Sequence, residues 1–117
     1  MTGSERTSRD FERAVSDLPA PEEIREDWNR FVFDAAERVW QRPALGRAQR
    51  SIATIAALTA LQRPRQLRAH IAHALENGLS RSDVSEVIMH TAVYAGFPSG
   101  VEGMRIAQEV FEGRPSR

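Results

Sequence analysis

The hydrophobic and polar positions of this chain recur with helical spacing over most of its length. Between Pro21 and Trp40, apolar side chains return every three or four residues, which predicts an amphipathic helix. Pro21 suits the first turn of a helix, and Pro43 prevents the helix from continuing. The predicted apolar face consists of Ile24, Trp28, Phe31, Val32, Ala35 and Val39.

A second helix is predicted over residues 46–61. It is rich in Ala, Ile, Leu and Thr around most of its circumference, a pattern typical of a helix that is buried on most sides. Five short helices can hardly surround one of their own number completely. This second helix therefore also predicts self-association.

Three more helices follow in the remaining chain. Pro64 breaks the chain before a third helix over about residues 65–77, and Gly78 is placed to end it. Ser80 and Asp83 have the spacing of a capping box for a fourth helix, over about residues 81–95. A turn at residues 96–98 leads to a fifth helix, about residues 98–111. Since no segment alternates like a strand, the predicted fold class is all-α, a single-domain bundle of about five main helices.

The length of 117 residues indicates one domain. Residues 1–18 are polar with little periodicity and are expected to form a mobile arm, followed by a helical domain at 19–112 and a tail at 113–117. The N-terminal stretch lacks the apolar segment of a signal peptide. The longest apolar run, residues 52–61, is shorter than the about 20 residues that span a bilayer. We therefore expect a cytoplasmic protein that does not enter membranes.

Composition excludes several kinds of chemistry. The 16 acidic and 16 basic residues balance, so no strong field favours nucleic acid or an anionic membrane. All basic residues are arginine, and without lysine no Schiff base to a carbonyl substrate or to pyridoxal phosphate can form. Without cysteine there is no thiolate nucleophile, disulfide or redox pair. An enzyme of this composition works with His, Glu, Asp, Arg, Tyr and Ser.

Two histidines lie on the predicted third helix. At about 100° per residue, His70 falls at the edge of the apolar stripe, whereas His73 falls further round, towards solvent. His70 is therefore the candidate for chemistry, and His73 is expected at the surface. Geometry alone leaves open whether His70 is functional or a packing residue. The apolar stripe itself consists of Leu67, Ile71, Ala74 and Leu75.

The fourth helix places Glu86, His90 and Tyr94 along one ridge, at i, i+4 and i+8. A carboxylate one turn from a histidine can orient the imidazole ring and hold its proton. The alternative is an ordinary surface pair, with Tyr94 packing against a neighbour. The core side of this helix is predicted to hold Val84, Ile88, Thr91 and Ala95.

Arginines flank the entry to the apolar second helix. Arg42 and Arg50 could capture a carboxylate in bidentate fashion at the mouth of an apolar cavity, or they could form salt bridges. A metal site at His70, His73 and His90 lacks the supporting carboxylate or cysteine spacing, so no metal is expected.

Four stretches together resemble the carboxymuconolactone decarboxylase family. They are VWQRP (39–43), RSIATIAALTAL (50–61), LRAHIAHALENG (67–78) and SEVIMHTAVYAGFP (85–98), in the family's order, and the resemblance covers about residues 31–112. It implies an all-helical fold that assembles into homotrimers or homohexamers, with the apolar helices at subunit contacts and pockets between subunits.

The resemblance also implies a chemistry. One branch of the family uses a Cys-x-x-Cys pair, which this chain lacks. The other branch decarboxylates 4-carboxymuconolactone without a cofactor. In that reaction the electrons left by CO2 flow to the lactone carbonyl, giving a dienolate that must be reprotonated on carbon. His70 would donate this proton, while His90 or Tyr94 would assist or donate to the oxyanion.

The implied binding residues are Arg50 and Arg42, which would hold a substrate carboxylate, together with Trp40 and Gln66. The chain also departs from the typical family stretch WGEVWSRPGLDRRTRS, where it has AERVWQRPALGRAQRS. Arg38 stands where the family has an acidic residue. Glu37, which stands in place of the preceding glycine, could take over the role of that acid. Gly46 replaces Asp, and Gln66 replaces Glu.

These departures concern the substrate more than the fold. The leading hypothesis is a cofactor-independent decarboxylase acting on 4-carboxymuconolactone or a related small carboxylated lactone. Two alternatives remain: a lyase or isomerase for a different small substrate in a biosynthetic pathway, and a non-catalytic helical oligomer that binds a small acid.

Overall fold

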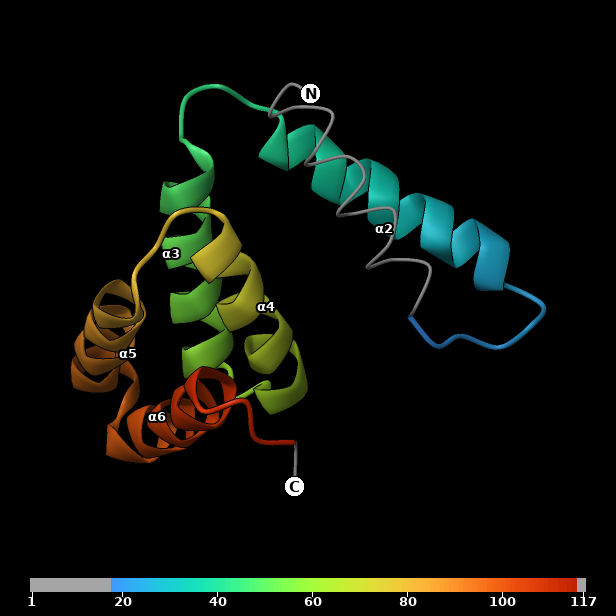
Figure 1. Cartoon of the computed structure of the whole chain (residues 1–117). Coiled ribbons are helices and arrows are strands. Elements are labelled where there is room, and N and C mark those ends of the chain that lie inside the picture. The colour runs from blue at the N-terminus through green and yellow to red at the C-terminus, as the bar shows by residue number, and fades with distance from the viewer. Residues whose placement is uncertain (1–17, 116–117) are drawn as a thin grey trace. The chain divides into compact units, whose positions relative to one another are not determined.

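The computed structural model describes residues 18–115 and shows five helices there (Figure 1). They are α2 (Arg25–Trp40), α3 (Arg47–Ala60), α4 (Pro64–Glu76), α5 (Arg81–Ala95) and α6 (Phe97–Phe111). The all-α prediction is confirmed, and the predicted helix ends agree to within a few residues. The predicted arm, except for its last residue, and the last two residues of the predicted tail lie outside the described residues. In the part that the structure describes, no helix is long and apolar enough to cross a membrane.

Backbone contacts divide the chain into two units, one ending at Leu45 and one beginning at Gly46, inside the predicted 19–112 domain. The described part of the first unit is built around α2. This helix begins four residues later than predicted, because residues 22–24 form a turn in which the Ile24 N–H donates to the Pro21 carbonyl (3.1 Å). The rings of Trp28 and Phe31 pack against each other at a centroid distance of 5.9 Å. No residue of α2 is buried, so its apolar face stays open.

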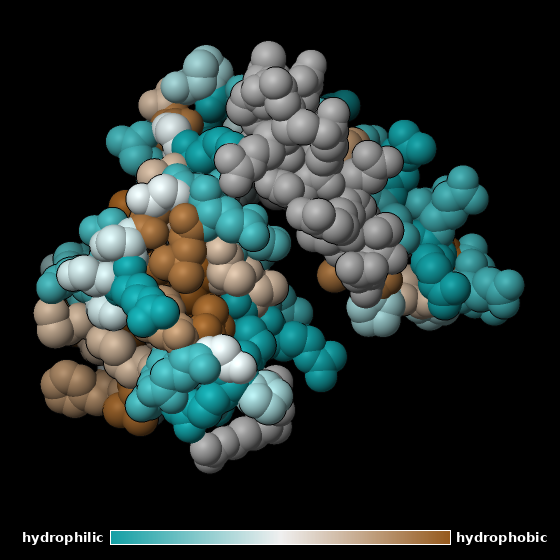
Figure 2. All heavy atoms as spheres, in the orientation of Figure 1, coloured by the Kyte–Doolittle hydropathy of each residue, from teal (hydrophilic) through white to brown (hydrophobic). Residues whose placement is uncertain are grey.

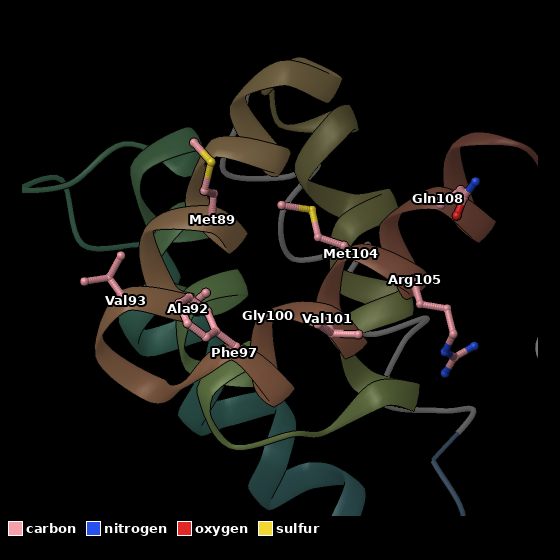
Figure 3. Close-up of a pocket in the computed structure, with 9 residues that line it drawn as sticks. All are labelled: Met89, Ala92, Val93, Phe97, Gly100, Val101, Met104, Arg105 and Gln108. Atoms are coloured by element: carbon pink, nitrogen blue, oxygen red, sulfur yellow. The ribbon is translucent and has the colours of Figure 1, made fainter.

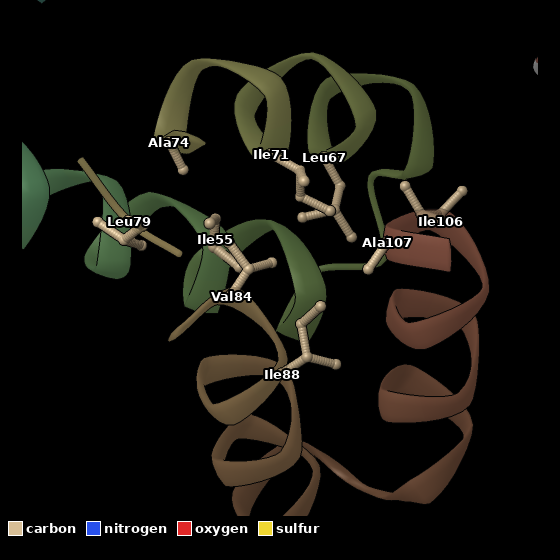
Figure 4. Close-up of a cluster of buried hydrophobic side chains, with 9 residues drawn as sticks. All are labelled: Ile55, Leu67, Ile71, Ala74, Leu79, Val84, Ile88, Ile106 and Ala107. Atoms are coloured by element: carbon tan, nitrogen blue, oxygen red, sulfur yellow. The ribbon is translucent and has the colours of Figure 1, made fainter. Parts of the chain in front are cut away.

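The second unit consists of the other four helices. Helix α3 packs against both α4 and α5, which make few contacts with each other, so α4 and α5 flank α3. Helix α6 packs mainly on α5 and α4. Each helix contributes to one core (Figure 4), made of Ile55, Leu67, Ile71, Ala74, Leu79, Val84, Ile88, Ile106 and Ala107.

Local signals in the sequence end and begin these helices as predicted. Gly78 follows α4 with φ of +104°, a conformation that glycine adopts without strain. The Asp83 N–H donates to the Ser80 hydroxyl (3.0 Å), and the Ser80 N–H donates to the Asp83 carboxylate (2.8 Å). The predicted capping box at the start of α5 is therefore confirmed.

Helix α3 is less enclosed than its composition suggested. One face is buried, through Ser51, Ile55 and Thr59, while Ile52 is 42% exposed. The prediction that α3 is buried on most sides is wrong for a single copy, because the three neighbouring helices cover only one side. Ala95, predicted on the core side of α5, is also exposed, because it is the last residue of that helix. Hydrophobic side chains accordingly interrupt the hydrophilic surface of this unit in Figure 2.

Helix α6 is held to its neighbours by a buried carboxylate and by two glycines. The Glu109 side chain, 1% exposed, accepts hydrogen bonds from Arg68 on α4 and from Arg105 on its own helix. A Cβ on Gly100 would lie 2.5 Å from the Ala92 Cβ, so α5 and α6 approach closely there. Gly103 lies similarly close to α5 and α3.

Candidate functional site

The His70 and His73 side chains on α4 form a pair. Their ring centroids are 5.4 Å apart and the rings are nearly perpendicular, at 84°. Both residues are half-buried, whereas the sequence pattern placed His73 towards solvent. The reason is that residues three apart on a helix are neighbours, so His73 covers part of His70 and is covered by it in turn.

His70 lies on the side of α4 that faces α3. Asn77 is seven residues after His70, which on a helix places the two within about 20° of the same direction. The Asn77 amide donates to the Ser51 hydroxyl on α3 (3.0 Å), and its oxygen accepts from Arg47 (2.5 Å). The opposite flank of α4 faces α6, because Arg68 binds Glu109 there.

Burial sets the protonation of His70. It lowers the pKa of the His70 imidazole below its ordinary value near 6.5, and a positive charge on His73 lowers it further. His70 therefore holds its proton weakly in the free protein. A negatively charged group beside the ring would favour the protonated form and raise the pKa again.

His90 and Tyr94 form a second ring pair, on α5, with centroids 5.2 Å apart. Both are exposed, Tyr94 to 80%. Ala92, which meets α6, lies two residues from each of them and so points about 160° away from them. The pair therefore lies on the flank of α5 that is turned away from α6. Within one copy, His70 and this pair are carried by helices on opposite sides of α3.

The other predicted site residues lie near the helix ends. Arg50 is in the first turn of α3, half-buried, and its carbonyl accepts from the Thr54 hydroxyl (3.0 Å). Gln66 is exposed in the first turn of α4. Among residues 18–115, no three His, Cys, Asp or Glu side chains gather in a way that could hold a metal ion.

Three predicted residues belong to the first unit. Glu37 is half-buried and shares one face of α2 with Asp34, Arg38 and Gln41, which line a hollow of about 380 Å³. Trp40 is the last residue of α2 and is half-buried. Arg42, two residues further on, is exposed.

An apolar groove between α5 and α6 was not predicted. It has a volume of about 600 Å³, and Figure 3 shows its apolar side chains over both helices, with Arg105 and Gln108 at one end. Phe97 is 77% exposed and Val101 69% exposed, which is unusual for such large apolar side chains. The apolar residues of these two helices were visible in the sequence, but the sequence did not show which of them would stay exposed outside the core. The remaining lining residues are Met89, Ala92, Val93, Gly100 and Met104.

The structure thus defines an all-helical protein with two ring pairs on the helices flanking α3. The model of the "Carboxymuconolactone decarboxylase family" matches residues 26–109. The chain belongs to that family, and the resemblance noted in the sequence is confirmed.

Two relatives illustrate the similarity. A 4-carboxymuconolactone decarboxylase of Acinetobacter baylyi is 38% identical over 91 residues, which make up 77% of this chain and 68% of that protein. A nitrosuccinic acid decarboxylase of Metarhizium robertsii is 38% identical over 71 residues, 61% of this chain and 50% of that protein. The alignment with the second relative therefore spans only half of its length.

Proposed function

We propose that this protein is a decarboxylase that acts without a cofactor on a small carboxylated substrate, with 4-carboxymuconolactone as the first candidate. The observation that carries the proposal is the similarity to two relatives, at the same 38% identity, that are both named decarboxylases. A carboxy-lyase type of activity is what the two have in common. The chemistry left to this chain, without lysine or cysteine, is compatible with it.

The two relatives' names point to substrates with one chemical feature in common. In 4-carboxymuconolactone, the electron pair released with CO2 can pass to a conjugated lactone carbonyl. In nitrosuccinic acid, a nitro group on the carbon that loses CO2 can accept the electron pair. Each substrate also keeps a second carboxylate. The proposed reaction therefore requires a binding site for this carboxylate, donors to the developing anion, and one proton for carbon.

His70 supplies that proton in the proposed mechanism. Its imidazole is mostly neutral near pH 7 in the free protein, because burial lowers its pKa. A substrate carboxylate bound beside it favours protonation, so substrate binding itself prepares the acid. After CO2 leaves, the carbanionic carbon takes the proton from His70, and the neutral imidazole must then regain a proton from solvent.

The remaining site residues have proposed roles in substrate binding, in stabilising the developing anion and in proton transfer. Arg50, with Arg42, binds the retained carboxylate, since a guanidinium matches a carboxylate in bidentate geometry. His90 and Tyr94 donate hydrogen bonds to the developing anion. Trp40 and Gln66 contact the substrate, and Glu37 assists proton transfer.

Self-association is part of the proposal. His90 and Tyr94 are exposed in one copy, and donors in water stabilise a developing anion far less than donors in a site from which water is excluded. Assembly into a homotrimer or homohexamer covers apolar surface and closes such a site. The exposed apolar side chains of α3 and of the α5–α6 groove are the surfaces available for assembly. The cytoplasmic location expected from the sequence stays a prediction.

The direct test is to add purified protein to 4-carboxymuconolactone and, separately, to nitrosuccinic acid, and to follow CO2 release. The His70→Asn variant should lose roughly 100-fold or more in kcat, because it removes the proton donor. Arg65→Gln, an exposed change on the same helix, is the matched control and should keep full activity. Full turnover by His70→Asn overturns the assignment of the proton donor.

The second relative favours an alternative substrate class. If nitrosuccinic acid is turned over and 4-carboxymuconolactone is not, the protein is a decarboxylase for an open-chain nitro acid, and Arg38, Gly46 and Gln66 become candidates for that preference. If a folded oligomer turns over neither compound but binds either acid, the non-catalytic alternative replaces the proposal.

The assembly is tested separately by analytical ultracentrifugation. Val101→Glu places a charge in the apolar groove and should shift the protein towards smaller species. Gln108→Glu introduces the same charge at the polar end of the groove and serves as the control. An unchanged assembly in Val101→Glu excludes the groove as a subunit contact.

A further inference from the structure

His73 is a titratable group that the mechanism above does not use. It lies one helical turn from His70, half-buried, and the two rings are nearly perpendicular at a centroid distance of 5.4 Å. On α4 it falls about 60° further than His70 from the buried stripe of Leu67, Ile71 and Ala74. His73 therefore lies between His70 and the surface of its unit.

The balance of the proposed reaction requires a route for one proton. A carboxylate loses CO2, its electron pair passes into the conjugated carbonyl or nitro group, and a carbon of the resulting anion takes the proton of the His70 imidazolium. The product and neutral His70 remain, with no change of oxidation state to be balanced by a second reactant. Each turnover thus consumes one proton, which must pass from solvent to a half-buried ring that the substrate or product covers.

We propose that His73 is the positioning residue that carries this proton from solvent to His70 and keeps the His70 ring in place between turnovers. The proposal rests on the proposed function, in which His70 protonates carbon. It adds a role for a residue whose place in the sequence pattern indicated only a surface position. The χ2 torsion of histidine is broad, so the two rings can turn a nitrogen of one towards a nitrogen of the other without moving the backbone.

The electrostatics of the pair support an exchange of one proton. Burial disfavours a charge on His70, and a charge on His73 disfavours it further, so the pKa of His70 is lowered. Two coupled imidazoles of this kind hold one proton more readily than two. A substrate carboxylate beside His70 offsets this effect, so its arrival favours transfer of a proton to His70.

Neighbouring helices add few charges on this flank. Helix α3, which lies on the His70 side of α4, carries Arg47 and Arg50 in its first turn. On the opposite flank of α4, Arg68 is bound to Glu109 of α6, which also binds Arg105. The other charged groups on α4 or in the first turn of α5 are Arg65, Glu76, Arg81 and Asp83.

The coupling is tested first without substrate. The pKa of His70 is measured by NMR from its ring proton as a function of pH, in the wild type and in His73→Gln, with Arg65→Gln as the matched control on the same helix. Removal of His73 should raise the pKa of His70, and the control should leave it unchanged. An unchanged pKa of His70 in His73→Gln overturns the proposal, whatever the activity of the protein.

The proton transfer is tested by turnover of 4-carboxymuconolactone and nitrosuccinic acid. His73→Ala should lower kcat by roughly 10- to 100-fold, less than loss of the acid itself, with little change in KM. Added imidazole should restore kcat in proportion to its concentration, which a purely structural defect does not allow. Unchanged kcat in His73→Ala, or a loss that imidazole does not restore, overturns the relay alone. A wild type that decarboxylates neither compound overturns the proposed function and the relay with it.

Discussion

The Glu109 carboxylate offers the sharpest test of how this fold is held together. It is 1% exposed, and it accepts hydrogen bonds from Arg68 on α4 and Arg105 on α6. Arg68 also donates to the Arg114 carbonyl (3.1 Å), so the cluster connects α4, α6 and the segment after α6. We predict that Glu109→Ala is severely destabilising, because it leaves Arg68 partly buried without its counter-charge.

The expected loss follows from the burial of the partners. Removing one member of a buried ion pair costs about 3–5 kcal/mol. The Arg68 side chain is 23% exposed and can regain some hydration, so the lower end, about 3 kcal/mol, applies. This is a large fraction of the about 5–15 kcal/mol by which folded domains are stable. Glu109→Gln, which keeps the shape and one acceptor, should cost about 1.5–3 kcal/mol.

The assay is urea unfolding followed by circular dichroism, at one fixed protein concentration because assembly changes apparent stability. With a slope of about 2 kcal/mol per M, Glu109→Ala should lower the midpoint by about 1.5 M. Glu112→Ala is the control, since Glu112 is an exposed acid that binds Arg114 at the end of the same helix, and it should change stability by less than about 0.5 kcal/mol. A cost below about 1 kcal/mol for Glu109→Ala is the behaviour of a surface pair and refutes the reasoning.

Three further predictions concern packing, capping and pH. Gly100→Ala should destabilise the protein by about 1–3 kcal/mol, because its Cβ would meet that of Ala92 at 2.5 Å. Adding Ala92→Gly to this variant should recover part of the loss. Equal stability of Gly100→Ala and the double variant contradicts this explanation. Ser80→Ala should cost about 1 kcal/mol through loss of the capping box, measured by thermal unfolding against the exposed Ser82→Ala, which should cost less. Because the pKa of His70 is lowered in the folded state, the unfolded chain binds more protons between that pKa and 6.5, so unfolding free energy should fall as pH falls through this window. The wild type should show this fall and His70→Asn a smaller one; equal slopes contradict the lowered pKa of His70.

The predicted and observed roles of the histidines differ for a physical reason. Helical periodicity correctly placed His70 at the edge of the buried stripe. It placed His73 towards solvent, because the direction of a residue around a helix does not show how far neighbouring side chains bury it. The structure shows the two rings in contact, and this contact is the basis of the relay proposal.

The site as a whole depended on tertiary structure. The sequence grouped His70, His90 and Tyr94 by chemical type, but α3 separates the helix that carries His70 from the helix that carries the other two. Residues distant in sequence converge only through helix packing, which local patterns do not encode. The same holds for the α5–α6 groove, since exposure of Phe97 and Val101 depends on which faces the neighbouring helices cover.

What the sequence by itself determined is the set of helices, most of their ends and the family. Apolar spacing, prolines, Gly78 and the Ser80–Asp83 pair act within a few residues, so they could be recognised without a structure. Only the tertiary structure decided that a buried Glu109 joins two helices, that one face of α3 stays open in a single copy, and that His73 lies against His70. These features arise from burial and from contacts between side chains, which depend on how the helices pack.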